Sequence, residues 1–183
     1  MFVLENQLLK VAVNPIGAEL DSVFHKDFGL EYMWSGDADF WGKKSPVLFP
    51  IVGSLKENTY FFESQKYSLS RHGFARERVF ILGKQDDISL LFTLQYDSET
   101  LKKYPFKFLF QIKYTLVENK LNVTYIVENQ SLTTMPFSVG AHPAFKIPLS
   151  EDTSYEDYFL EINQKETFGR YPLSIEGLIV PAG

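Results

Sequence analysis

Cysteine is absent from the 183-residue chain. Its absence excludes disulfide bonds, thiolate zinc sites and cysteine nucleophiles, and it is compatible with a reducing cytoplasm. Phosphate-binding loops are missing as well, because no G-x-G-x-x-G occurs and Gly53-Ser54-Leu55-Lys56 lacks P-loop spacing. No G-x-S-x-G nucleophile motif is present either. The three histidines are therefore the first candidates for chemistry.

Long apolar runs and an excess of basic residues are also lacking. No run approaches the roughly 20 residues of a membrane helix, and the first residues, MFVLENQLLKVAVN, do not have the pattern of a signal peptide. The chain has 18 Lys and Arg against 23 Asp and Glu. Nucleic-acid binding requires a concentrated basic face. We therefore expect a soluble cytoplasmic protein that binds neither membranes nor nucleic acids.

Aromatic residues are abundant, with 17 Phe and 10 Tyr. Many of them alternate with polar residues in the two-residue period of a half-buried strand. The clearest row is Phe106, Phe108, Phe110, Ile112, Tyr114 and Leu116, followed after the turn Glu118-Asn119-Lys120 by Leu121, Val123, Tyr125 and Val127. This pattern predicts a long antiparallel hairpin with one buried aromatic face.

Helical signals are scarce. The best candidate is Ser98–Tyr104, where Ser98 is predicted to cap, Glu99 and Lys103 are four residues apart, and Pro105 ends the segment. No repeat, low-complexity tract or flexible linker divides the chain. The sequence therefore predicts a single all-β domain over residues 1–183, a large antiparallel β-sandwich.

Two of the histidines have neighbours that constrain the backbone. His72 is followed by Gly73, which permits a sharp turn, and His142 is followed by Pro143. A purely structural role stays open for each of them. His25, in a polar turn, is best interpreted as a solvated loop residue.

Three arginines and two tryptophans remain open in the same way. Arg71, Arg76 and Arg78 surround His72 in the sequence, but arginines at strand edges are often simply solvated. Trp34 and Trp41 bracket a polar run, and a core role is more probable for them than ligand stacking. No two histidines have the helical spacing of a metal site, and no metal is expected.

Three motifs taken in order resemble the aldose 1-epimerase (galactose mutarotase) superfamily, in its LacX-like branch. They are SPVLFPIVG, HGFAR and GAHPAF, at residues 45–53, 72–76 and 140–145. The resemblance covers essentially the whole chain. It implies an antiparallel β-supersandwich, of which this chain corresponds to the N-terminal and middle parts and is incomplete at the C-terminus.

The resemblance also implies a function: the α and β anomers of a free monosaccharide are interconverted by acid–base ring opening, without a cofactor. His72 matches the histidine that orients the sugar, and His142 matches the general acid. Arg71, Arg76 and Lys56 are candidates to bind sugar hydroxyls, whereas Trp34 and Phe145 are candidates to pack on the sugar.

The chain departs from the family pattern in two places. Ser54 stands where many members have an arginine, and Lys56 or Arg76 is expected to supply that charge. The segment Phe168–Leu178 resembles the middle of the family domain, and Glu176 is in the wrong setting for the catalytic base. No residue is found that matches the catalytic glutamate.

Two other functions stay open: a carbohydrate-binding β-sandwich without turnover, and a hexose-phosphate 1-epimerase. The second is kept open by the cluster of Arg71, Arg76 and Arg78. If the C-terminal strands of the domain are missing, we also expect exposed edge strands that pair with another copy or another chain.

Overall fold

A computed structural model describes residues 1–165, 167, 169 and 171–180. Residues 168 and 170 of the segment that resembles the middle of the family domain lie outside the described residues. The described chain consists mostly of antiparallel strands with almost no helix, which confirms the all-β prediction. None of its helices is both long and apolar enough to cross a membrane.

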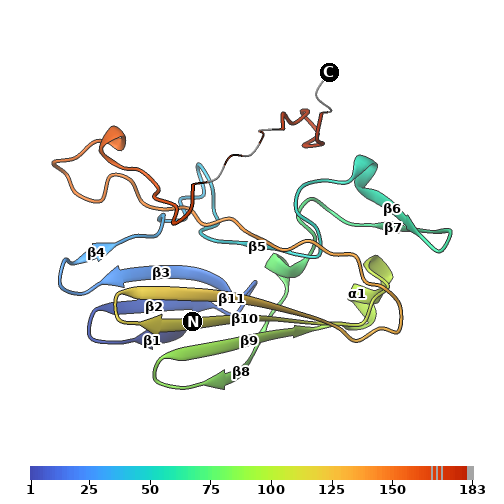
Figure 1. The fold of residues 1–183 in the computed structure, drawn as a ribbon, viewed down its shortest axis with the longest axis horizontal. Helices are drawn as coiled ribbons and strands as arrows, with labels where there is room; N and C mark the ends of the chain where they lie inside the picture. Colours follow the sequence, from blue (N-terminus) through green and yellow to red (C-terminus); the bar gives the residue numbers. More distant parts are fainter. Residues whose placement is uncertain (166, 168, 170, 181–183) are drawn as a thin grey trace.

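Two four-stranded antiparallel sheets carry most of the chain (Figure 1). The first has the order β1-β2-β3-β4 and is built from β1 (Phe2–Glu5), β2 (Leu9–Asn14), β3 (Glu19–His25) and β4 (Leu30–Glu31). The second has the order β11-β10-β9-β8 and is built from β8 (Ile81–Gln85), β9 (Ser89–Gln95), β10 (Phe108–Val117) and β11 (Lys120–Asn129). Neighbouring strands within each sheet are thus consecutive in the sequence.

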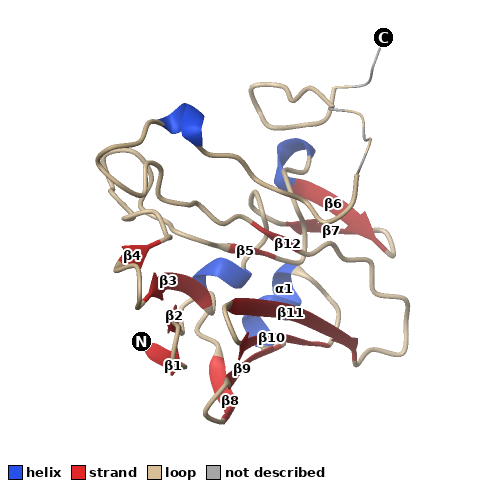
Figure 2. Ribbon diagram, turned by 60° about the vertical axis from the view of Figure 1, so that its left-hand side comes forward, coloured by secondary structure: helices blue, strands red, loops and turns tan. Residues whose placement is uncertain are grey.

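Smaller elements lie above these sheets, among long loops (Figures 1 and 2). One two-stranded sheet pairs β5 (Val47–Leu48) with β12 (Gly140–Ala141), and another pairs β6 (Thr59–Phe62) with β7 (Gln65–Ser68). The described helical elements are α1 (Ser98–Lys103) and three 3₁₀ turns, η1 (Lys56–Asn58), η2 (Ala75–Glu77) and η3 (Tyr155–Asp157).

The predicted aromatic face forms the centre of the core. The alternating residues from Phe106 to Leu116 are all less than 5% exposed, and they pack with apolar residues of both large sheets. Phe2 of β1 meets Phe92 of β9 edge to face at 5.5 Å, and the Tyr114 hydroxyl donates to the Ala18 carbonyl at 2.7 Å. One hydrophobic core therefore joins the two sheets.

The strand starts later than predicted. Phe106 is buried, but its N–H donates to the Tyr104 carbonyl, and β10 begins at Phe108. Phe106 keeps the alternating burial of the strand, but it does not pair with a neighbouring strand. Alternation of apolar residues alone therefore places the start of the strand too early.

The short helix is confirmed, but its cap is not the predicted one. Asp97, rather than Ser98, is the N-cap, and its carboxylate accepts from the Thr100 N–H at 2.7 Å. The ion pair on the helix joins Glu99 to Lys102 at 2.6 Å, not to Lys103. Asp and Ser are both good caps, and Asp97 has the extended backbone that a cap requires.

Candidate functional site

The loop after β7 carries His72 and is fixed to the core through Phe49. Phe49 is fully buried and stacks on Phe110 with ring centroids 4.5 Å apart. Its carbonyl accepts from the N–H groups of Phe74 and Ala75, at 3.0 and 3.2 Å. A side chain at Gly73 would place its Cβ only 2.2 Å from that carbonyl oxygen. The glycine of HGFAR is therefore needed for this close approach.

His72 is held by two hydrogen bonds with one residue, Gly53. The His72 N–H donates to the Gly53 carbonyl at 2.8 Å, and the Gly53 N–H donates to His72 Nδ1 at 3.0 Å. Because Nδ1 accepts, the proton of the neutral ring lies on Nε2, which is left as a donor. This pair joins the end of SPVLFPIVG to the start of HGFAR.

The surroundings of His72 favour its neutral form. Burial lowers the pKa of the ring below its usual value, and the positive charges of Arg71 and Arg76 lower this pKa further, followed by His142. These charges all disfavour a second proton. His72 is therefore suited to donate a hydrogen bond from Nε2 near neutral pH.

His142 is brought to His72 by the short pairing of β12 with β5. Gly140 lies opposite Leu48 and Ala141 opposite Val47, and the His142 N–H then donates to the Pro46 carbonyl at 3.2 Å. The imidazole rings of His72 and His142 have centroids 6.5 Å apart. His142 is exposed and His72 is partly buried, so solvent reaches both residues. We call these two residues, with Trp41, the histidine site.

The two tryptophans have different roles. The indole of Trp41 lies 5.0 Å from the His142 ring, between centroids. Trp34 instead donates its Nε1–H to the Trp41 carbonyl at 3.0 Å and so fixes the backbone that carries the second indole. The sequence singles out Trp34 as the sugar contact, whereas the structure puts Trp41 beside the histidine. The bracketing of one polar run by both residues was the only signal of this arrangement.

The three arginines do not act as one cluster. Arg71 and Arg76 influence His72, and the Arg76 guanidinium donates to the Arg71 carbonyl at 3.2 Å. Arg78 forms an ion pair with Asp97, the cap of α1. Arg78 therefore belongs to the packing of the helix rather than to the histidine site.

Arg71 also lies beside Ser54, the residue that replaces the family arginine. A Cβ built on Gly177 would lie 3.2 Å from the Ser54 hydroxyl oxygen and 3.3 Å from the Arg71 guanidinium carbon. Ser54 and Arg71 thus meet under the turn at Gly177. Arg71 is therefore a candidate to supply positive charge near Ser54, besides the Lys56 and Arg76 that the sequence suggests.

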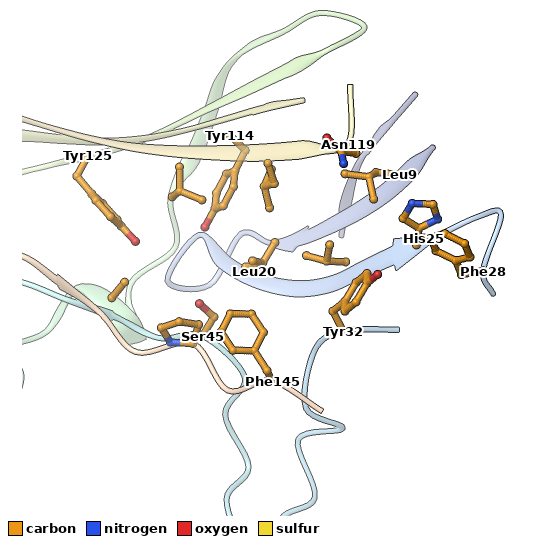
Figure 3. A pocket seen from close by; sticks show the side chains of 15 residues that line it. Leu9, Leu20, His25, Phe28, Tyr32, Ser45, Tyr114, Asn119, Tyr125 and Phe145 are labelled. Carbon is orange, nitrogen blue, oxygen red and sulfur yellow. The ribbon is translucent and has the colours of Figure 1, made fainter. Parts of the chain in front are cut away.

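The two remaining predicted sugar contacts, Lys56 and Phe145, differ in their surroundings. Lys56 is in the exposed turn η1 and is not among the charges that lower the pKa of His72. Phe145 pairs with Met33 and directs its ring into a groove between the sheets, where Tyr32 and Ser45 also lie (Figure 3). Phe145 is therefore directed away from the histidine site, whereas a role of Lys56 in sugar binding stays a prediction. The sequence placed Phe145 there because it lies three residues after His142, but extended backbone directs successive side chains to opposite faces.

His25 is separate from the histidine site, but it is not the solvated loop residue that the sequence predicted, because it is the last residue of β3 and its Nδ1 is buried. It stacks on Phe28 with ring centroids 4.4 Å apart and lines the same groove as Phe145.

The histidine site combines groups that suit a ligand rich in hydroxyls. Nε2 of His72 is a donor, Arg71 provides a cation, and the Trp41 indole offers a flat apolar surface beside His142. His142 is exposed, and a histidine can give or take a proton near neutral pH. This set can hold hydroxyl groups and exchange one proton with a bound molecule.

Comparisons with known proteins agree with the three motifs. The sequence model of the aldose 1-epimerase family matches residues 1–171. Protein LacX of Lactococcus lactis, in its plasmid and chromosomal forms, is 36% identical over 170 residues, which are 90% of this chain and 56% of LacX.

Solved structures show the same fold. A galactose mutarotase related enzyme from Lactobacillus acidophilus is 40% identical with a TM-score of 0.83, over 85% of this chain and 52% of the relative. A galactose mutarotase-like protein from Lactobacillus casei is 38% identical with a TM-score of 0.79, over 83% of this chain and 52% of the relative. The chain thus spans about half the length of the relatives it matches.

Proposed function

We propose, from the premise that the chain belongs to the aldose 1-epimerase family, that the histidine site binds a free aldose and takes part in interconverting its α and β anomers. The observation that carries this proposal is the pairing of His72 with His142 at 6.5 Å, from two motifs far apart in the sequence.

The reaction needs an acid and a base on the two oxygens of the hemiacetal. A base takes the proton from the hydroxyl on C1 while an acid protonates the ring oxygen O5, and the C1–O5 bond breaks to give the open-chain aldehyde. Rotation about C1–C2 and closure in the reverse sense give the other anomer. We assign the acid at O5 to His142, which takes its proton back when the ring closes.

His72 serves as a binding group in this proposal. Its Nδ1 is occupied by the Gly53 N–H, so only Nε2–H is directed to the ligand, as a hydrogen-bond donor to a sugar hydroxyl. Its lowered pKa keeps it neutral beside Arg71, which binds a second hydroxyl. Trp41 packs on the apolar face of the sugar ring.

The test is the rate of anomer exchange for fresh α-D-galactose and α-D-glucose, followed by polarimetry or by NMR exchange spectroscopy. We expect this chain to exchange anomers weakly or not at all, because no residue matches the catalytic glutamate that would act as the base. In a longer form that supplies this base, His142→Gln should lower kcat by roughly 10²–10⁴-fold, the usual contribution of a positioned acid. His25→Gln is the matched control, because His25 lies in the groove between the sheets. Unchanged exchange in His142→Gln would remove this residue from the mechanism.

A second candidate is sugar binding without turnover. It is favoured by the charges that surround His72, since within the described residues those that influence its pKa come from Arg71, Arg76 and His142 and not from a carboxylate. The two functions separate in one titration. Perturbation of the histidine ring signals by galactose, with an anomer exchange rate equal to that of buffer, would establish binding alone.

A third candidate, hexose-phosphate epimerisation, rests on Arg71 and Arg76 after Arg78 is assigned to Asp97. A phosphate needs concentrated positive charge. Galactose 6-phosphate should then bind at least tenfold more tightly than galactose, and Arg76→Gln should abolish that difference. Equal affinities of the chain for the two sugars would exclude this candidate.

A further inference from the structure

β11 is the outermost strand of the second sheet. It is 10 residues long, and in the described part of the chain it pairs only with β10 (Figure 1). A long open edge of this kind presents a row of unused N–H and C=O groups to another strand. The question is which strand fits it.

The phase of the ladder determines which backbone groups of β11 are free. Leu116 of β10 donates its N–H to Ile88, toward β9, and Gln130 donates its N–H to Lys107, its partner in the β10–β11 register. Antiparallel strands alternate between residues that bond to one neighbour and residues that bond to the other. The even-numbered residues of β11 therefore bond to β10, and the odd-numbered ones direct their groups outward.

The same odd-numbered residues carry most of the apolar side chains of β11, namely Leu121, Val123, Tyr125 and Val127, whereas Ile126 lies on the opposite face and is 41% exposed. The four odd-numbered side chains are only partly covered, and Val123 is 37% exposed. Leu121, Val123 and Tyr125 line a cavity of about 570 Å³ between the two large sheets (Figure 3). An added strand would continue this apolar row along the open side of the cavity.

β11 is complementary to itself when it is turned antiparallel about Thr124. In that register Lys120 of each copy lies opposite Glu128 of the other, so two opposite-charge pairs form. A shift of two residues in either direction separates both pairs. Glu128 accepts from the exposed Gln130 amide on one oxygen at 3.0 Å, which leaves the other oxygen for the ammonium group.

The apolar residues and the free backbone groups agree with this register. Leu121 lies opposite the partner's Val127, and Val123 lies opposite the partner's Tyr125. All of these are outward-bonding residues, which is what an antiparallel ladder requires of pairs that exchange hydrogen bonds. Aromatic and β-branched pairs opposite one another stabilise such a ladder.

We propose that a second copy of this chain docks on β11, strand against strand about a twofold axis at Thr124, to give one continuous eight-stranded sheet from two four-stranded sheets. The contact is isologous, so it closes after two copies and does not propagate into a fibre. It involves no residue of the histidine site.

The test is the dimer dissociation constant, measured by sedimentation equilibrium on the whole chain. We expect Lys120→Glu to raise this constant roughly tenfold or more, because both ion pairs become like-charge pairs. Glu128→Lys should act in the same way, and the double variant Lys120→Glu/Glu128→Lys should restore the original value with the charges exchanged. Lys84→Glu, on the opposite edge strand β8, is the matched control and should change nothing.

A proline scan of two adjacent positions tests the strand pairing itself. Val123→Pro removes an outward N–H and should give a folded monomer, whereas Thr124→Pro removes a bond to β10 and should destabilise the fold. Circular dichroism distinguishes a folded monomer from an unfolded chain.

Several outcomes would overturn the proposal. One is a wild-type chain that stays monomeric at high micromolar concentration. Another is a Lys84→Glu variant whose dimer dissociation constant rises as much as that of Lys120→Glu. The third is a double variant whose dissociation constant stays as high as those of the single variants. A wild-type chain that is monomeric alone but forms a one-to-one complex with the unmatched portion of the L. acidophilus relative would show that another occupant fits β11. Activity assays are not needed to reach any of these results, so the proposed function stands or fails separately.

Discussion

His72 occupies a backbone conformation that residues with side chains seldom adopt. Its φ is 68°, and that of Gly73 is 73°. Left-handed backbone costs a non-glycine residue roughly 1 kcal/mol or more, and such positions concentrate at functional sites. Here the strain directs the imidazole toward His142 while its backbone and Nδ1 bind Gly53.

The first residue-scale prediction concerns Gly73. Gly73→Ala should lower the free energy of unfolding by about 2 kcal/mol or more, because it adds left-handed strain to a contact with the Phe49 carbonyl. Gly29→Ala is the matched control, since φ there is +64° but nothing lies within 4 Å of the added Cβ. Urea titration of both variants measures the difference, and equal losses would show that the Phe49 contact has no cost.

The second concerns the protonation of His72. Because folding lowers the pKa of this ring below 6.5, the unfolded chain binds more protons in this range. The resulting contribution to stability is fully present above pH 6.5 and is lost as the pH falls below it. Stability measured between about pH 5 and pH 8 should therefore decline less toward acid in His72→Gln than in the wild type.

The tautomer gives a direct check of the same environment. Nitrogen-15 NMR at neutral pH should show the His72 proton on Nε2, because Nδ1 accepts from Gly53. A proton on Nδ1 would contradict the binding role given to this ring.

At the scale of single elements, the strands and the helix were predictable, and their ends were not. The alternation of apolar and polar residues identified β10 and β11, because each strand has ten residues and its two faces differ in polarity. The cap of α1 was missed by one residue because Asp97 and Ser98 are both capping types. Asp97 also forms an ion pair with a residue distant in the sequence, Arg78, which no local pattern reveals.

Asp97 therefore supports an element-scale prediction. Asp97→Ala removes both the cap and the partner of Arg78 and should cost about 1–2 kcal/mol of unfolding free energy. Asp97→Asn keeps a capping oxygen and should recover most of that loss, since a partly exposed ion pair contributes little. Thermal unfolding of the two variants separates the contributions, and equal destabilisation would mean that the charge matters more than the cap.

At the scale of the whole molecule, the site depends on contacts that only the folded chain provides. The motifs predicted that His72 and His142 meet, and the structure agrees. They did not predict that Phe145 faces the groove or that Trp41 stands by His142, because each depends on which face of an extended segment is turned to the core. The sharing of Gly53 by both motifs likewise becomes visible only in three dimensions.

Phe49 links that site to the core, which gives a prediction at this scale. Phe49→Ala should lower the unfolding free energy by about 3–5 kcal/mol and also shift the His72 titration toward that of a free histidine, since the loop 72–75 loses its support. Phe92→Ala is the control, because Phe92 is equally buried but packs against Phe2. It should cost a similar amount and leave the His72 titration unchanged, and a shift in both variants would refute the special link through Phe49.

The placement of the two tryptophans has an optical consequence. They are the only indoles in the sequence, and one stands against His142 while the other binds its backbone. Indole fluorescence therefore reports on the histidine site, whereas far-ultraviolet circular dichroism reports on the sheets. Protonation of His142 should quench the emission of Trp41, and a bound sugar ring should shift its wavelength. The loosening of the site and the melting of the sheets can thus be recorded by two separate optical signals of the unlabelled protein.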